Sequence, residues 1–458
     1  MSVDPQESGT DLGEIFERVF AWTGELTREV HYVLLLLALF VVPRVLQRYR
    51  IPRAITSLAL GAGATFLFPA LRTDETIQLF ATFGIVALFL FAGLDVEVAV
   101  LRRETKVLSQ HLALGVALLL GTAWLLARTL GLGPRSSALV ALALLTPSAG
   151  FILESLEGIG ATGRERFWIR SKVIATELVA LAVLFVTLQA ESWQRLVVSA
   201  LVLTAMIAGL PPLFRLFARL VAPYAPKSEF AFLLMVAVLC GIITKHLGVY
   251  YLVGAFVVGM AAQRFRKRLP AMASERMLDA VEAFASLFVP FYFFAAGLGL
   301  QRGDFQLEAL ALGLALLAFA FPVRVASIAA HRRLMLGERW RAGWRVGVAM
   351  MPTLVFTLVV AQALREERFP VPPYLYGALV VYAILSTLIP TLILRLPPPE
   401  FDALQAPTVG YGRDTAETFD EGGQGEGAPR EPGEEGATAP AGVGSAADEL
   451  EETREARR

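Results

Sequence analysis

Repeated runs of apolar residues dominate this sequence, and many of them are about 20 residues long. A helix of that length crosses a bilayer, where only helices and closed barrels satisfy every backbone polar group. Hydrophobic residues make up 55% of the 458 residues and charged residues 18%, whereas soluble domains carry roughly 25% charged residues. The chain is therefore expected to be an all-α polytopic membrane protein.

The apolar runs predict about thirteen transmembrane helices. We expect them at residues 31–47, 51–70, 76–94, 107–128, 134–156, 167–189, 194–221, 229–246, 248–263, 279–300, 305–331, 343–364 and 371–396. Residues 1–30 precede this transmembrane domain of residues 31–396, and residues 397–458 follow it.

Basic residues are distributed unevenly between the predicted loops. Loops after odd-numbered helices carry 23 Lys and Arg residues, and loops after even-numbered helices carry 8. Because cytoplasmic loops are enriched in Lys and Arg, we expect an extracytoplasmic N-terminal segment and a cytoplasmic C-terminus. We therefore expect a multi-pass protein of the inner or plasma membrane. Its basic loops are expected to contact anionic lipid headgroups rather than nucleic acid.

The C-terminal tail has a different composition from the rest of the chain. Residues 400–458 carry 15 acidic and 5 basic residues and are rich in Gly and Pro. Such a segment cannot bury a core and is expected to be disordered. It contains no Gly-rich strand-to-helix turn, so no nucleotide-sensing domain is predicted. The single cysteine, Cys240, excludes an internal disulfide and a cysteine-cluster metal site, and we expect no cofactor.

Two pairs of similar stretches indicate an inverted repeat. Phe91–Asp95 resembles Ala295–Gly299 at an offset of 204, and the interruption at Thr146–Gly150 matches Met350–Thr353 at an offset of 205. A shift of seven helices reverses the direction of the chain through the membrane. We therefore expect a first repeat at about 31–189, a linker helix at 194–221 and a second repeat at 229–396. Interrupted helices at matching positions of two such halves indicate a transporter's binding site.

Glu177 lies near the middle of the predicted helix at residues 167–189, directly after Thr176. A carboxylate at membrane depth is costly, and by default it marks an ion or proton path. The alternative is a glutamate that is protonated or paired with a basic group and serves packing alone. Glu154 is another acidic residue near the predicted breaks, towards the inner end of its helix. We expect its side chain to be exposed to water.

The two predicted breaks carry residues suited to binding a monovalent cation. Pro147 and Pro352 interrupt the helices, and Thr146, Ser148 and Thr353 add hydroxyl oxygens to the unwound carbonyls. The broken helices also end inside the bilayer, where their N-terminal ends carry partial positive charge and their C-terminal ends carry partial negative charge. For each hydroxyl, the alternative is a hydrogen bond to a carbonyl of its own helix.

Arg324 is a second intramembrane charge, seven residues before the expected helix end at His331. A long arginine side chain could compensate the dipoles of the broken helices, pair with Glu177, or extend to the cytoplasmic surface.

Five stretches within residues 83–301 together resemble the monovalent cation:proton antiporter superfamily. They are closest to its second branch, which includes Kef-type potassium efflux proteins and bacterial sodium/proton exchangers. The stretches are FGIVALFLFAGLDVEVAVLR, ALLTPSAGFILESLEGIG, KVIATELVALAVLF, GVYYLVGAFVVGMAAQ and FVPFYFFAAGLGLQ.

The resemblance implies a homodimer in which each protomer has a dimerisation domain and a six-helix core with two crossed, broken helices, the fifth and the twelfth. It also implies elevator-like alternating access. The family's pair on the sixth helix, usually ending in Asp, reads Thr176–Glu177 here, and the family's basic residue on the eleventh helix is matched by Arg324. Met350–Thr353 replaces the glycine-and-acid motif often found at the second break.

These observations predict an antiporter, not an enzyme, that exchanges protons for Na⁺ or K⁺ at Glu177. Thr176 does not ionise in the working range and Arg324 stays charged, so one carboxylate predicts electroneutral exchange. Two alternatives remain: a transporter of organic or anionic solutes on the same fold, and a non-transporting regulatory relative in which Glu177 and Arg324 form a fixed salt bridge.

Overall fold

The computed structural model describes residues 28–94, 96, 105–149, 152, 163–190, 192–225, 228–266, 275–365 and 369–394. All of them belong to the first of two units, Met1–Gln405, and the second unit is Ala406–Arg458. The predicted N-terminal segment, except for residues 28–30, the acidic tail and Glu154 lie outside the described residues.

Within the described ranges every regular element is helical. The elements are α2 (Arg28–Gln47), α3 (Arg53–Leu67), η1 (Pro69–Thr73), α4 (Glu75–Leu94), α6 (Thr105–Leu130), α7 (Pro134–Leu145), α9 (Gly163–Gln189), α10 (Trp193–Leu220), α11 (Glu229–His246), α12 (Tyr251–Arg266), α13 (Glu275–Leu298), η3 (Arg302–Phe305), α14 (Leu307–Leu336), α15 (Trp340–Ala349), α16 (Leu354–Leu364) and α17 (Leu375–Ile393).

The all-α membrane fold predicted from the apolar runs is confirmed. In the described part of the chain, eight helices are long and apolar enough to cross a membrane, or nine if the bent pair α15–α16 is one span. Each of the thirteen expected ranges overlaps one described α-helix, or two in the case of residues 343–364. Because several of these helices are short, the count of thirteen membrane spans is approximate.

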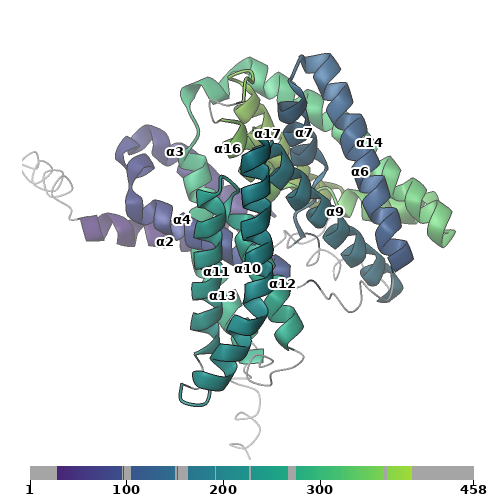
Figure 1. Ribbon diagram of the computed structural model, residues 1–458. Coiled ribbons are helices and arrows are strands. Elements are labelled where there is room, and N and C mark those ends of the chain that lie inside the picture. The colour runs from purple at the N-terminus through teal and green to yellow at the C-terminus, as the bar shows by residue number, and fades with distance from the viewer. Residues whose placement is uncertain are drawn as a thin grey trace, which may run out of the picture. The chain divides into compact units, whose positions relative to one another are not determined.

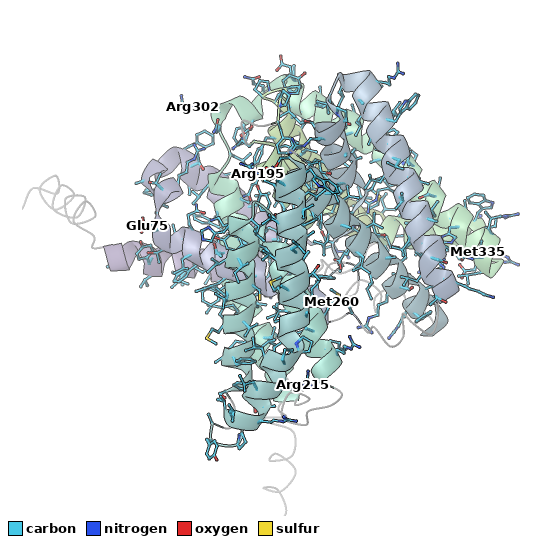
Figure 2. The ribbon with its side chains drawn as sticks, in the orientation of Figure 1. Glu75, Arg195, Arg215, Met260, Arg302 and Met335 are labelled. Atoms are coloured by element: carbon cyan, nitrogen blue, oxygen red, sulfur yellow. The ribbon has the colours of Figure 1, made fainter. Side chains whose placement is uncertain are left out.

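Local sequence signals account for several helix ends. Pro134 occupies the first turn of α7, where its missing N–H has no intrahelical partner to lose. Ser192 caps α10 by accepting a hydrogen bond from the backbone N–H of Arg195 at 3.2 Å. Figure 2 labels Arg195 and Arg215 near opposite ends of this helix. Gly337 ends α14 in the left-handed conformation, at φ +66°.

The helix contacts fall into two groups. In the first, α4 packs on α12 and α13, α13 also packs on α3, and α11 packs on α12. In the second, α14 packs on α15 and α17, α6 on α7 and α9, and α16 on α7 and α17. Helix α10 contacts both α12 and α9. Figure 1 labels α6, α7, α9 and α14 near one another and α11 beside α13.

Two close contacts between glycines join helices of the first group. A Cβ atom added to Gly93 of α4 would lie 2.9 Å from the Cα of Gly259 in α12. A Cβ atom added to Gly297 of α13 would lie 3.0 Å from the carbonyl carbon of Gly61 in α3. Only glycine permits such close backbone approach. A seven-helix shift relates α3 to α12 and α4 to α13, so an inverted repeat predicts this pair of contacts.

Two of the 23 basic residues in the loop count, Lys172 and Arg332, are buried within membrane helices. Lys172 lies inside α9, with 6% of its surface exposed. Helix α14 continues to Leu336, five residues beyond the expected end at residue 331, and contains the fully buried Arg332. Arg332 forms ion pairs with Glu165 at 3.0 Å and Glu338 at 2.6 Å, which explains how its charge is tolerated.

Candidate functional site

Both predicted helix breaks are present, and they are hydrogen-bonded to each other. Helix α7 ends at Leu145, and α15 and α16 are bent by 53° at the four residues between them. The backbone N–H of Ser148 donates to the carbonyl of Pro352 at 2.8 Å. The hydroxyl of Ser148 accepts from the backbone N–H of Val355 at 3.2 Å and so caps the N-terminus of α16. Proline causes the breaks because it has no N–H and disfavours a helical residue before it.

The carbonyls at the broken end of α7 are satisfied by side chains from other helices. Thr357 of α16 donates its hydroxyl to the carbonyl of Ala143 at 2.8 Å. Tyr382 of α17 donates to the carbonyl of Leu144 at 2.7 Å. The last carbonyls of a helix have no intrahelical partner, and a bilayer offers no water to replace one. These two hydroxyls therefore make the interruption of α7 possible at membrane depth.

Arg324 satisfies the broken end of α15 in the same way. Its guanidinium donates to the carbonyls of Met350 at 2.5 Å and Met351 at 2.9 Å, and to the hydroxyl of Tyr382 at 3.3 Å. The side chain is 4% exposed. A cation at this position also offsets the negative end of the α15 dipole. The place where the break after α7 meets the break between α15 and α16 is called the crossing below. Among the described residues Arg324 therefore binds carbonyls at the crossing and not Glu177.

Replacing Thr357 by valine tests the contribution of the crossing to stability. We expect Thr357→Val to lower the free energy of unfolding by about 1–2 kcal/mol, because it leaves a buried carbonyl without a donor. Thr387→Val is the matched control, because Thr387 is equally buried but donates to Ala383 of its own helix. Thermal unfolding of purified protein in detergent compares the two, and equal losses would contradict a special role for the contact between α16 and α7.

Glu177 is 6% exposed and lines a cavity of about 30 Å³ at the crossing. The lining comes from the first break, including Pro147 and Ser148, from Val355 and Phe356 of α16, and from α4. A volume of this order holds at least one water molecule. Glu177 therefore faces the boundary between the broken helices and α4 of the other helix group.

The other predicted residues line a second cavity, of about 50 Å³. Thr146, Thr176 and Arg324 lie there together with Lys172, and Pro147 borders both cavities. The hydroxyl of Thr176 donates to the carbonyl of Lys172 at 2.8 Å. The first break thus has an acidic cavity on one side and a basic cavity on the other.

Thr353 is not placed in either cavity. Its hydroxyl is 3.0 Å from that of Ser386 in α17, and the residue is fully buried. Thr353 therefore joins the second break to α17. The candidate cation ligands that share a cavity with Glu177 are reduced to Ser148 and the backbone around it.

Three residues of this region are absent from the prediction. Tyr382 and Thr357 sit in apolar helices, and nothing in the sequence distinguishes them from packing residues. Lys172 does have a signal, because it is a charge inside a predicted span, five positions before Glu177.

Comparison with known proteins identifies the family. Residues 34–397 match the family model described as "Sodium/hydrogen exchanger, transmembrane". The chain belongs to the sodium/hydrogen exchanger family. This confirms the resemblance to the monovalent cation:proton antiporter superfamily, and it places the chain among transporters rather than enzymes.

Individual relatives agree with this placement. The chain is 26% identical over 380 residues to "Probable Na(+)/H(+) antiporter 3" of Methanocaldococcus jannaschii, covering 80% of this chain and 95% of the relative. It is 25% identical to "Na(+)/H(+) antiporter NhaS5" of Synechocystis, covering 73% of this chain and 49% of the relative. The structure of the sodium proton antiporter MjNhaP1 of M. jannaschii matches with a TM-score of 0.60 at 12% identity, covering 80% and 95% of the two chains. That likeness confirms the fold.

Proposed function

We propose that this sodium/hydrogen exchanger family member is a Na⁺/proton antiporter in which Glu177 binds the proton and the cation alternately. The observation that carries the proposal is the position of Glu177, which is buried beside Ser148 in a cavity at the crossing of the broken helices. An intramembrane carboxylate at such a crossing is suited to a monovalent cation. The relatives named as Na⁺/H⁺ antiporters support Na⁺ as the cation, and K⁺ is the alternative.

Coupling follows from competition for one group. A protonated Glu177 is neutral and has no charge to offer a cation, and a bound cation excludes the proton. If only these two loaded forms cross the membrane, each cation moves against one proton. With Glu177 as the only group that changes its charge, the exchange would be electroneutral.

The two helix groups support an elevator-like movement. The cavity of Glu177 has one wall from α4 in the first group, and its other walls come from the break that follows α7 and from α9 and α16 in the second group. Sliding one group past the other would change the side from which this cavity is reached. In this proposal the protein is a homodimer whose first helix group stays fixed.

A small-anion transporter is the second candidate, favoured by one observation. Lys172 and Arg324 both line the second cavity, which gives it two cationic side chains. The regulatory alternative with a Glu177–Arg324 salt bridge has less support, because the guanidinium binds two carbonyls and Tyr382 within the described structure.

Transport by purified protein in proteoliposomes tests the function. A pH-sensitive dye inside the vesicles reports proton release when Na⁺, K⁺ or choline is added outside. We expect the vesicle interior to become alkaline with Na⁺ and not with choline. The response to K⁺ shows whether the protein selects Na⁺ over K⁺. A proton flux that requires external chloride but no alkali cation would favour the small-anion transporter instead.

The orientation remains the one predicted from the loop charges, with the N-terminus outside and the tail in the cytoplasm. Protease added to right-side-out membrane vesicles is expected to leave the tail from residue 406 onward intact. Cleavage of the tail in sealed vesicles would reverse the assignment.

A further inference from the structure

Lys172 is a charged residue at the crossing, among the residues that the structure describes, that the proposed mechanism leaves unused. It lies on α9, five positions before Glu177, and its side chain lines the second cavity with Thr146 and Arg324. Only 6% of the residue is exposed. Pro147 of the first break lines both this cavity and that of Glu177, so Lys172 and Glu177 lie in cavities on either side of it.

The surroundings of Lys172 hold its ammonium without an acidic partner in the described part of the chain. Its Nζ atom lies 5.9 Å from the centre of the Trp168 ring. The charged and titratable groups that interact with it are Arg324 and His331 of α14 and His111 of α6. Within the described residues, no carboxylate forms an ion pair with its Nζ atom. A buried ammonium is costly unless it is paired and hydrogen-bonded.

The chemistry of lysine differs here from that of its neighbour. Arg324 keeps its charge under all working conditions, whereas a buried lysine can release its proton. Electroneutral exchange requires that Glu177 is the only group near the site that changes its charge, and Thr176 and Arg324 satisfy this condition. Lys172 does not meet that condition, because it lies in the same region and can change its charge.

We propose that Lys172 is a second proton-binding group of the transport cycle, so that two protons are exchanged for each cation. This inference rests on the proposed antiport at Glu177. In the proton-loaded form Glu177 is a neutral carboxylic acid and Lys172 is an ammonium, which gives a site charge of +1. When the cation binds, the acid releases H⁺ to become a carboxylate and the ammonium releases H⁺ to become an amine. The cation-loaded form then has a site charge of zero, and each cycle moves one net charge with the protons.

The direction of current tests this stoichiometry. Proteoliposomes on a solid-supported membrane are given a Na⁺ concentration jump at equal pH on both sides. If two protons leave for each Na⁺ that enters, the transient current runs opposite to the cation movement. The pH-sensitive dye measures exchange in the same vesicles, so loss of current is separated from loss of transport.

Lys172→Arg is the decisive variant, with Lys172→Gln beside it. Arginine keeps the charge but does not release a proton, so both variants are expected to exchange Na⁺ for protons without the transient current of the wild type. Lys106→Gln, which removes an exposed lysine of α6, is the control and is expected to keep the wild-type current. Thermal unfolding in detergent shows whether each variant is folded.

The possible results separate this inference from the function. Wild-type exchange without current would overturn the role of Lys172 and leave the Glu177 mechanism standing, whatever the variants do. A Lys172→Arg protein that keeps the wild-type current would show that the residue supplies only a fixed charge, and would also overturn the inference. If the wild type shows no proton flux with Na⁺ or K⁺, the proposed function itself fails.

Discussion

Glu177→Gln is expected to abolish cation/proton exchange while the protein keeps its fold. Glutamine has nearly the same shape but carries no charge to attract a cation and releases no proton. We expect the dye assay in proteoliposomes to show at least a hundredfold loss of Na⁺-driven proton flux (about 3 kcal/mol at 1.4 kcal/mol per tenfold change). The melting temperature should stay close to that of the wild type, because glutamine is nearly isosteric with glutamate.

Glu308→Gln is the matched control, since Glu308 lies exposed in the first turn of α14. It should transport at the wild-type rate. Glu177→Asp should retain partial exchange, because the charge remains but lies one methylene closer to the backbone of α9. Wild-type flux from the Glu177→Gln protein would remove the central role of this carboxylate.

Arg324→Ala is expected to destabilise the protein by about 3 kcal/mol, the scale for removing one partner of a buried charged interaction. The change leaves the carbonyls of Met350 and Met351 without donors at the broken end of α15. It also opens space beside the second cavity. Exchange should fall sharply, because the break that positions Ser148 loses its support.

Arg324→Lys should lie between the wild type and Arg324→Ala. Lysine restores the charge and a donor but lacks the planar fork that reaches two carbonyls. Arg333→Ala is the control on the same helix, because Arg333 is exposed and its loss should change stability by less than about 0.5 kcal/mol. The melting temperatures of the three variants test whether Arg324 stabilises the broken end of α15. An Arg324→Ala protein as stable as the Arg333→Ala control would contradict this role.

The parts of the site that follow from local chemistry could be predicted from the sequence. Pro147 and Pro352 interrupt their helices wherever these pack, and a carboxylate such as Glu177 is conspicuous in an apolar run. The partners of the broken ends could not be predicted, because they depend on which helices cross. Tyr382 reaches Leu144 across 238 positions of the chain, and no sequence pattern marks that pair.

Lys172 illustrates a different difficulty. Basic residues near the end of a membrane helix usually extend to the surface, and the loop count treats Lys172 in that way. Here α6, which packs on α9, and side chains of α14 enclose it beside Arg324 and Trp168. Its burial is a property of the assembled helices and not of its distance from the helix end.

The contacts between Gly93 and Gly259 and between Gly61 and Gly297 have a mechanical consequence. The spacing of these helices is fixed by backbone against backbone, so it does not relax when side chains change rotamer. Gly93 directly follows Ala92, which together with Leu88 and Phe89 forms the α4 wall of the Glu177 cavity. The α4 wall of the cavity is therefore rigid. If Glu177 moves along this wall, the shape of the wall stays constant during the movement.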